Sequence, residues 1–198
     1  MARAEFLFDF GSPNAYCAYK VIPGIEARTG VKFDFTPILL GGLFKLTNNS
    51  SPVIAYAGVP NKLQYEMLEM RRFIERHKLP FVMNPNFPIN TLLLMRMATA
   101  AQMDDALAPF VDAAMRFMWE TPRKMDDPEV VLIAANEAGL DGAALAARAQ
   151  APEVKAKLMA NTEDAAKRGA FGAPTFFIDG EMYFGKNTLF EIEERLKA

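Results

Sequence analysis

Hydrophobic residues alternate with other residues in two stretches near the start of the chain. Every second position from Phe6 to Phe10 is phenylalanine, and residues 31–35 repeat the alternation. A period of two places successive side chains on opposite faces of a β-strand, so both stretches are predicted strands. Residues 15–28 between them are long enough for a crossover helix, which predicts a parallel strand–helix–strand unit.

The middle of the chain changes from strand-like to helical spacing. Leu63, Met67, Met70 and Ile74 recur at intervals of three or four residues, which is the spacing of the buried face of an amphipathic helix. Similar patterns return several times before residue 169, so this block is predicted to be mainly helical. Helices are predicted over residues 63–77, 90–103, 107–119, 128–138 and 152–168.

The last part of the chain returns to strands. Two short apolar stretches, residues 175–178 and 182–184, flank an Asp-Gly dipeptide, which is typical of a tight hairpin turn. Thr188 and Glu191 have the spacing of a capping box at the start of a final helix.

This order of elements is that of a thioredoxin-like fold with a helical insertion: strand–helix–strand, a helical block, then strand–strand–helix. We therefore predict an α/β fold in which residues 1–38 and 170–198 form a thioredoxin-like domain. Residues 39–169 are predicted to form a large helical insertion subdomain.

Composition and charge limit the classes of partner. The 198 residues are 51% hydrophobic and 23% charged, which suits one domain with a sizeable core. The net charge of -2 lacks the basic footprint of a nucleic-acid-binding protein. No stretch approaches the roughly 18 apolar residues of a membrane helix, and the first residues lack the apolar region of a signal peptide. We expect a cytoplasmic protein that binds small molecules rather than nucleic acid or membrane.

The chain contains one cysteine, Cys17, and one histidine, His77. This composition excludes an internal disulfide and the usual zinc sites, which leaves only a carboxylate-only metal site open. Cys17 is expected to be a small buried apolar residue. Because disulfide exchange needs two sulfurs within reach of each other, we predict no dithiol oxidoreductase activity. Because one cysteine and one histidine do not supply the usual ligands, we also predict no metal.

Two short motifs carry the candidate chemistry. Residues 11–14, Gly-Ser-Pro-Asn, place the hydroxyl of Ser12 where the first strand gives way to a helix, and a helix N-terminus favours a bound anion. Residues 172–175, Gly-Ala-Pro-Thr, precede the third predicted strand, and a thioredoxin-type fold brings the two motifs together. A cis peptide bond at Ala173-Pro174 would turn the backbone of residue 173 toward a groove, where it can pair with a peptide-like ligand.

Simpler roles stay open for both motifs. Ser12 can act only as a helix cap, and Pro174 can be an ordinary trans proline of an edge strand. A nucleophilic serine needs an adjacent base, but His77 lies in a basic run without an acidic motif beside it, so a Ser-His-Asp mechanism is not indicated. A hydrogen bond from Ser12 to the thiolate of a bound thiol cofactor would instead lower the pKa of that thiol.

Three segments together resemble a known family. They are residues 8–13, Phe-Asp-Phe-Gly-Ser-Pro; residues 169–175, Gly-Ala-Phe-Gly-Ala-Pro-Thr; and Phe184-Gly185. In this order they are similar to the DsbA-like 2-hydroxychromene-2-carboxylate isomerases, relatives of the kappa-class glutathione transferases. The resemblance covers nearly the whole chain and implies a DsbA-like fold with glutathione as cofactor.

The resemblance also implies site residues. The implied glutathione-binding residues are Ser12, Asn49, Asn61, Lys62, Ala173, Pro174, Phe184, Gly185, Lys186 and Asn187, and the implied substrate-binding residues are Lys45, Asn61 and Phe87. Exposed lysines and loop asparagines are also common without such a function.

Two positions depart from the family pattern. Asn187 stands where the family usually has an acidic residue, which removes the ion pair expected with the α-amino group of glutathione. This favours weaker glutathione binding or another thiol, and Asn187 can equally be a helix cap. Phe87 replaces a phenol of the nearest isomerases, which makes the substrate less certain than the fold.

The implied activity is glutathione-dependent isomerisation of 2-hydroxychromene-2-carboxylate-like aromatic substrates, with Ser12 holding the glutathione thiolate. A kappa-like glutathione transferase is the alternative if the adduct is released. A catalytically silent binding protein on the same scaffold is a second alternative, and the loss of the acidic residue at position 187 favours it. A homodimer is expected, because the helical subdomain is rich in methionine and leucine and because the relatives are commonly dimers.

Overall fold

A four-stranded mixed sheet lies at the centre of the protein in the order β2-β1-β3-β4. The structure is a computed structural model that describes residues 2–197. Strand β1 (Ala4–Phe8) pairs in parallel with β2 (Phe33–Pro37) and antiparallel with β3 (Thr175–Ile178), which pairs antiparallel with β4 (Glu181–Phe184). The thioredoxin-like element order is confirmed. The division into subdomains stays a prediction, and its terminal residues 1 and 198 lie outside the described residues.

Both faces of the sheet are covered, so β1 is buried along its whole length. Phe6 and Phe8 pack on one face in the cluster that includes α1 (Pro13–Thr29) and α10 (Leu189–Lys197). Leu7 points to the opposite face, where it packs with α2 (Leu40–Leu46) and α9 (Pro152–Lys167). Alternate side chains of β1 therefore enter two different apolar clusters, one on each face of the sheet. Neither face of this strand is exposed to solvent.

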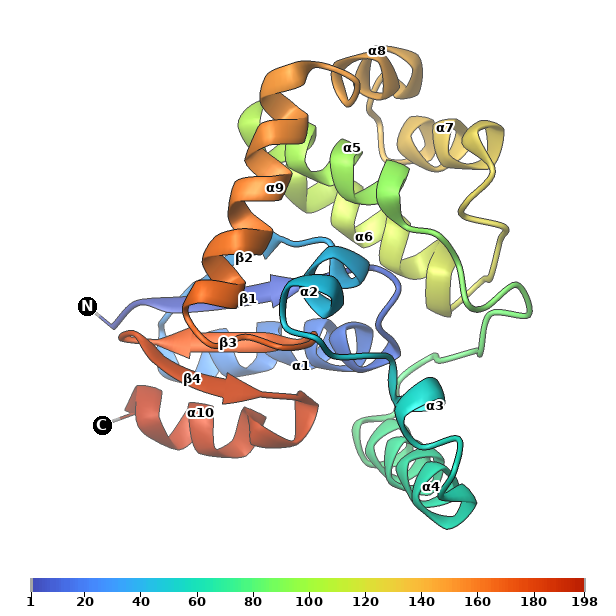
Figure 1. Cartoon of the computed structure of the whole chain (residues 1–198). Helices are drawn as coiled ribbons and strands as arrows, with labels where there is room; N and C mark the ends of the chain where they lie inside the picture. The colour runs from blue at the N-terminus through green and yellow to red at the C-terminus, as the bar shows by residue number, and fades with distance from the viewer. Residues whose placement is uncertain (1, 198) are drawn as a thin grey trace.

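The remaining helices fill the chain between β2 and β3. Helices α5 to α8 lie above the sheet in Figure 1, with α7 and α8 packed on α6 and α5, whereas α3 and α4 lie below. The predicted long helices are present, but α4 begins earlier than expected and the short helices α2, α3 and α8 were not predicted. Their bounds are α3 (Pro52–Ala55), α4 (Pro60–His77), α5 (Leu92–Met103), α6 (Leu107–Trp119), α7 (Pro128–Glu137) and α8 (Gly142–Arg148).

The C-terminal elements confirm one turn prediction and contradict another. Asp179 and Gly180 both have positive φ, at 50° and 88°, as a two-residue hairpin turn requires. The predicted capping box at Thr188 is wrong, because this residue ends the short 3₁₀ helix η1 (Lys186–Thr188). Its hydroxyl donates to the carbonyl of Gly185 at 2.9 Å.

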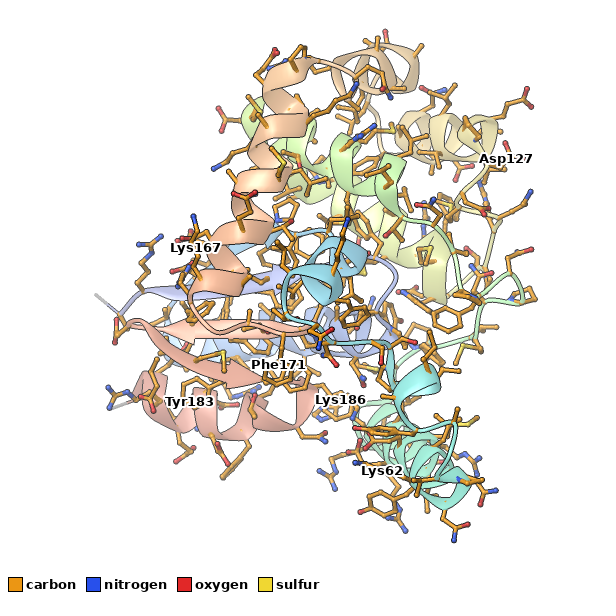
Figure 2. The ribbon with its side chains drawn as sticks, in the orientation of Figure 1. Lys62, Asp127, Lys167, Phe171, Tyr183 and Lys186 are labelled. Atoms are coloured by element: carbon orange, nitrogen blue, oxygen red, sulfur yellow. The ribbon has the colours of Figure 1, made fainter. Side chains whose placement is uncertain are left out.

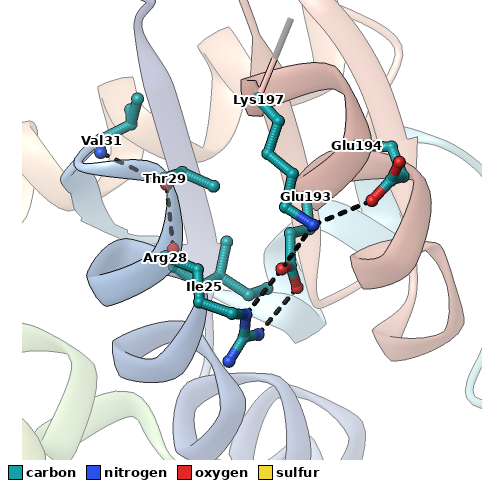
Figure 3. A network of polar contacts seen from close by, with 7 residues as sticks. All are labelled: Ile25, Arg28, Thr29, Val31, Glu193, Glu194 and Lys197. Carbon is teal, nitrogen blue, oxygen red and sulfur yellow. Dashed lines mark hydrogen bonds and ion pairs between the residues drawn. The ribbon is translucent and has the colours of Figure 1, made fainter.

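An ion-pair network fastens α10 to α1 (Figure 3). The guanidinium of Arg28 donates to both carboxylate oxygens of Glu193 at 2.6 and 2.7 Å. The ammonium of Lys197 lies 3.0 Å from Glu193 and from Glu194. The hydrogen bond from Arg28 is the main cause that lowers the pKa of Glu193 to about 2. The network adds polar contacts to the apolar packing of α10 through Leu189, Ile192 and Leu196.

Candidate active site

Ser12 lies at the N-terminus of α1, directly after the turn that follows β1. Its hydroxyl oxygen accepts a hydrogen bond from the amide of Ala15 at 3.1 Å, and the hydroxyl donates to the carbonyl of Ala173 at 2.8 Å. Pro13 occupies the first helical position, where a missing N–H costs nothing. The fold thus joins two motifs that are 161 residues apart. Ser12 is a helix cap and a bridge between the motifs at once.

The second motif adopts the backbone geometry expected of it. The Ala173-Pro174 peptide bond is cis. The carbonyl of Pro174 accepts from the amide of Gly185 at 2.9 Å, which brings in the third segment of the resemblance. Ser12, Ala173, Pro174 and Gly185 therefore form one continuous junction between β1, β3 and β4, which we call the Ser12 junction.

The surroundings of Ser12 contain no arrangement for a serine nucleophile. Both hydrogen bonds of its hydroxyl go to backbone groups. His77 lies on the last turn of α4, where its ring centroid is 4.4 Å from that of Phe73. Burial is the main cause that lowers the pKa of this histidine, followed by the charge of Arg76. A Ser-His pair is therefore not part of this site.

Asn49 and Phe184 flank the loop that leads into the Ser12 junction. The side-chain amide of Asn49 donates to the carbonyl of Phe171 at 2.8 Å. The ring of Phe184 lies 4.3 Å, centroid to centroid, from that of Phe171. Figure 2 labels Phe171 in the loop before β3. Phe171 itself was not singled out from the sequence, although it lies within a segment of the resemblance.

Lys186 and Asn187 begin the last helical segment, and Lys186 is almost wholly buried, with 3% of its surface exposed. Its ammonium forms an ion pair with Glu69 of α4 and donates to the side-chain oxygen of Asn187 at 3.1 Å. The ring centroid of Phe73 lies 5.2 Å from the same nitrogen. A carboxylate therefore stands beside Asn187, supplied by a different helix.

Cys17 is fully buried on α1, as expected. Burial is the main cause that raises the pKa of its thiol to about 12; the charge of Lys186 acts in the opposite direction, and that of Glu69 raises it further. The thiol is protonated at neutral pH and has no second cysteine to pair with. With one cysteine, the chain cannot form an internal disulfide.

The other implied site residues lie further out. Asn61 and Lys62 are exposed near the start of α4, and the Lys62 ammonium lies 4.0 Å from the ring centroid of Tyr56 (Figure 2). Lys45 is exposed on α2, and Phe87 is half-buried. Within residues 2–197, no hydrogen bond or ion pair joins any of these four side chains to the Ser12 junction.

Phe87 belongs to an aromatic cluster centred on Trp119. The ring centroids of Phe87 and Phe81 lie 5.9 and 5.7 Å from that of Trp119. The indole N–H of Trp119 donates to the carbonyl of Phe10 at 2.9 Å, two residues before Ser12. The half-buried ring of Phe87 is therefore anchored to the same turn that carries Ser12.

A cavity of about 360 Å³ lies between α1, α4 and α10. Lys186 and Asn187 lie in its wall together with Glu69 and Phe73. It is large enough for part of a small ligand.

Across the described part of the chain, no three His, Cys, Asp or Glu side chains are grouped as a metal site would require. The same residues include no helix with the length and apolar character needed to cross a bilayer.

The sequence as a whole matches one family model, described as a DSBA-like thioredoxin domain, over residues 4–197. The chain belongs to the DSBA-like thioredoxin family. The predicted DsbA-like fold is thereby confirmed.

Two kinds of relative are similar to this chain over nearly its full length. A 2-hydroxychromene-2-carboxylate isomerase of Sphingobium xenophagum is 26% identical and aligns over 97% of this chain and 96% of its own. Glutathione S-transferase kappa 1 of Rattus norvegicus is 27% identical over 93% of this chain and 86% of its own. The resemblance stated from the three segments is thus confirmed.

Solved structures agree on the fold. A 2-hydroxychromene-2-carboxylate isomerase structure superposes with a TM-score of 0.84 at 22% identity, over 98% of this chain and 93% of the other. A probable DsbA oxidoreductase of Streptomyces coelicolor superposes with a TM-score of 0.77 at 20% identity, over 99% and 88%.

Besides Phe171, two residues of this DSBA-like chain were missed by the reasoning from sequence. Glu69 lies on the predicted 63–77 helix, where nothing local distinguishes it from other exposed carboxylates. Asp9 lies inside a segment of the resemblance but received no role, and it is fully buried beside the Ser12 turn. An aspartate at the end of a predicted apolar strand was the available signal, because such a residue is rarely buried without partners.

Proposed function

We propose that this protein is a glutathione-dependent isomerase of 2-hydroxychromene-2-carboxylate-like aromatic compounds, in which the Ser12 hydroxyl stabilises the glutathione thiolate. The observation that carries the proposal is the Ser12 junction. The Ser12 hydroxyl, at the start of α1, donates to the carbonyl of Ala173 at 2.8 Å. The similarity to both isomerases and kappa-class transferases along the whole chain supports the same assignment.

The groups of the Ser12 junction have the chemistry that a cysteinyl thiol requires. A hydroxyl and a helix N-terminus both favour a sulfur anion and lower the pKa of the thiol. The adjacent peptide of Ala173 can pair with the backbone of a peptide-like ligand. Glutathione, when bound, would supply the nucleophilic thiolate that the chain itself lacks.

Ser12 must reorient its proton for this role. The residue is 5% exposed, and its hydroxyl now donates to Ala173. Rotation about the side-chain bond turns this donor toward a ligand while the oxygen keeps its hydrogen bond from Ala15. Such a rotation exchanges a neutral hydrogen bond for a charge-assisted one, which favours the ligand-bound orientation.

Glu69 offers a substitute for the acidic residue that is lacking at position 187. Its carboxylate meets the Lys186 ammonium beside Asn187 and is partly open to solvent, with 25% of the side chain exposed. A ligand α-ammonium at this end of the site would therefore find both a carboxylate and an amide oxygen. Lys186 orients these two acceptors rather than binding an anion itself, because its own charge is already paired.

The second substrate would meet a cation and an apolar ring. The Lys45 ammonium is exposed on α2 and is suited to pair with an aromatic carboxylate. Phe87 offers a partly exposed ring that Trp119 holds in place. Phe87 has no proton to donate and Lys45 is assigned to the carboxylate, so the nucleophilic chemistry is left to the thiolate.

The decisive experiment compares wild type with Ser12→Ala. We expect the pKa of bound glutathione, followed by the ultraviolet absorbance of its thiolate, to rise in the variant. Isomerase kcat/KM at neutral pH is expected to fall about tenfold or more, since one charge-assisted hydrogen bond is lost. Ser51→Ala is the matched control, because Ser51 makes no side-chain cap at α3. An unchanged pH–rate profile in Ser12→Ala would reject the role of this hydroxyl.

A kappa-like transferase is the second candidate, favoured by the full-length similarity to the rat kappa enzyme. The same apparatus would then release the thiol adduct instead of regenerating glutathione. Counting glutathione molecules consumed per product separates the two activities: none for an isomerase, one for a transferase.

A silent binding protein is a third reading, supported by Asn187 and by the low exposure of Ser12. Calorimetry with millimolar glutathione separates it from both enzymes, because absence of binding would favour the silent protein.

We also propose a homodimer, which light scattering tests directly.

A further inference from the structure

The carboxylate of Asp9 is buried where the first residues of three helices meet. One oxygen accepts from the amide of Gly11 at 2.8 Å and from the hydroxyl of Thr91 at 2.7 Å. The other accepts from the amide of Leu40, the first residue of α2, at 2.7 Å. Thr91 immediately precedes α5, and Gly11 precedes the cap of α1. Asp9 has no exposed surface.

These partners favour the anionic form of the side chain. Burial is the main cause that raises the pKa of Asp9 above its ordinary value, and the hydrogen bonds from Leu40, Gly11 and Thr91 act in the opposite direction. Two of the three partners are backbone amides, which can only donate, so a protonated carboxyl could place its own hydrogen only on the Thr91 hydroxyl and would lose a hydrogen bond to an amide. Three helix N-termini also surround the group with the positive ends of their dipoles. Within residues 2–197, no other charged side chain is bonded to this carboxylate.

A closed series of contacts connects Asp9 to both sides of the Ser12 junction. On one side, the backbone carbonyl of Asp9 accepts from the Ser12 amide at 3.0 Å. On the other, its carboxylate holds the start of α2, and the segment just after α2 carries Asn49, which binds the carbonyl of Phe171. Phe171 lies two residues before Ala173, whose carbonyl accepts from Ser12. The carboxylate thus acts on the turn before Ser12 through the Gly11 amide and on the Ala173 peptide through α2, while the backbone carbonyl of Asp9 contacts the Ser12 amide directly.

We propose that Asp9 is a positioning residue that sets the Ser12 hydroxyl against the Ala173 peptide. This inference rests on the proposed function only in its consequence for a bound thiolate. The geometric part concerns the protein alone and can be tested without a ligand.

The amides of Ala15 and Gly185 report on the Ser12 junction without touching Asp9. The Ala15 amide binds the Ser12 hydroxyl oxygen, and the Gly185 amide binds the carbonyl of Pro174. The Ala144 amide is a matched reference, since it is capped by Asp141 at the start of α8, at 2.9 Å. Amide hydrogen exchange by NMR measures all three in the same sample.

The variants are Asp9→Asn, Thr91→Val and Thr91→Ser. Asp9→Asn removes the charge and replaces one acceptor oxygen with a donor at nearly constant shape. Thr91→Val removes one donor, and Thr91→Ser retains that donor as the control. We expect exchange at Ala15 and Gly185 to accelerate about tenfold or more in the first two variants and to stay near wild type in the third. Thr91→Val carries the test if Asp9→Asn does not fold.

Two exchange results would overturn the inference. The first is unchanged exchange at Ala15 and Gly185 in both Asp9→Asn and Thr91→Val. The second is an acceleration shared equally by Ala144, because the carboxylate would then stabilise the whole fold rather than the Ser12 junction.

The pKa of bound glutathione provides a second test, because loss of positioning and simple loss of charge shift it in opposite directions. Loss of positioning in Asp9→Asn raises the pKa of the bound thiol, whereas simple removal of a nearby negative charge lowers it. A rise supports the inference and a fall overturns it. If wild type fails to bind glutathione while the exchange result holds, the proposed function fails and the positioning role stands. If wild type binds glutathione and the exchange is unchanged, the positioning role alone fails.

Discussion

The buried ion pair between Lys186 and Glu69 predicts an asymmetric response to mutation. The Lys186 side chain is 4% exposed, whereas that of Glu69 is 25% exposed. Glu69→Gln therefore leaves a buried ammonium without its counter-charge, with the amide oxygen at position 69, the Asn187 side chain and the ring of Phe73 as neutral partners. Lys186→Met leaves instead a carboxylate that can turn toward solvent. The two single variants thus remove the same ion pair at different costs.

The magnitudes follow from what remains buried. Removing one partner of a buried ion pair costs about 3 to 5 kcal/mol when the other charge is fully isolated. Glu69→Gln keeps an acceptor oxygen for Lys186, so we expect a loss of about 2 kcal/mol in the free energy of unfolding. Lys186→Met replaces the cation by an apolar side chain of similar length and is expected to cost about 1 kcal/mol or less. The double variant should resemble Lys186→Met.

Urea unfolding followed by circular dichroism measures these differences, provided that the slope m is the same for all variants. Glu66→Gln is the matched control, because Glu66 is an exposed carboxylate on the same helix. We expect it to shift the midpoint hardly at all. A cost of Lys186→Met equal to or larger than that of Glu69→Gln would refute the reasoning, because the carboxylate would then be the group that depends on its partner.

Three further predictions follow from other parts of the structure. Glu193→Gln is expected to lose under about 1 kcal/mol of stability at neutral pH, because the Arg28 side chain is 54% exposed and water screens the pair. The pKa of Glu193 lies near 2 in the folded protein, against an ordinary value of 4.5. The difference in stability between wild type and Glu193→Gln should therefore persist above pH 4.5 and vanish as the pH falls toward 2. An equal effect of Glu194→Gln would argue against Glu193 as the group responsible. Trp119→Phe leaves the Phe10 carbonyl without its indole donor and is expected to cost about 2 to 3 kcal/mol in urea unfolding by circular dichroism, so a loss below about 0.5 kcal/mol would contradict the importance of this contact. Cys17, with a pKa raised to about 12, should react with a maleimide at least about a hundredfold more slowly in the native protein than in urea, and rapid native labelling would show that the thiol is accessible.

Much of the fold could be predicted because its signals are local. The phenylalanine alternation located β1, the Asp-Gly dipeptide located the β3–β4 turn, and helical spacing located the long helices. The short helix α2 was missed because its sequence, Leu-Gly-Gly-Leu-Phe-Lys-Leu, contains two glycines and has no side-chain cap. Its first amide is held instead by Asp9, a residue 31 positions earlier. Tertiary contact thus supplied what the local sequence lacks.

The candidate site divides in the same way. Ser12 as a helix cap and Cys17 as a buried thiol follow from residue type and position along α1. The burial of Lys186 does not, since a lysine beside a helix start is expected to be exposed. Its burial depends on Glu69, which α4 brings from 117 residues away.

By itself, the sequence determined the strand and helix periods, the turn at Asp179, the hydroxyl at the head of α1 and the lack of a second sulfur. These properties depend on residue types and on spacings of a few positions. Only the tertiary structure decided which polar groups meet: Ser12 with Ala173, Asp9 with Thr91, and Lys186 with Glu69. The partners in these contacts are 82 to 161 residues apart. A buried polar group must find a partner wherever the packed chain provides one, and no local pattern records where that is.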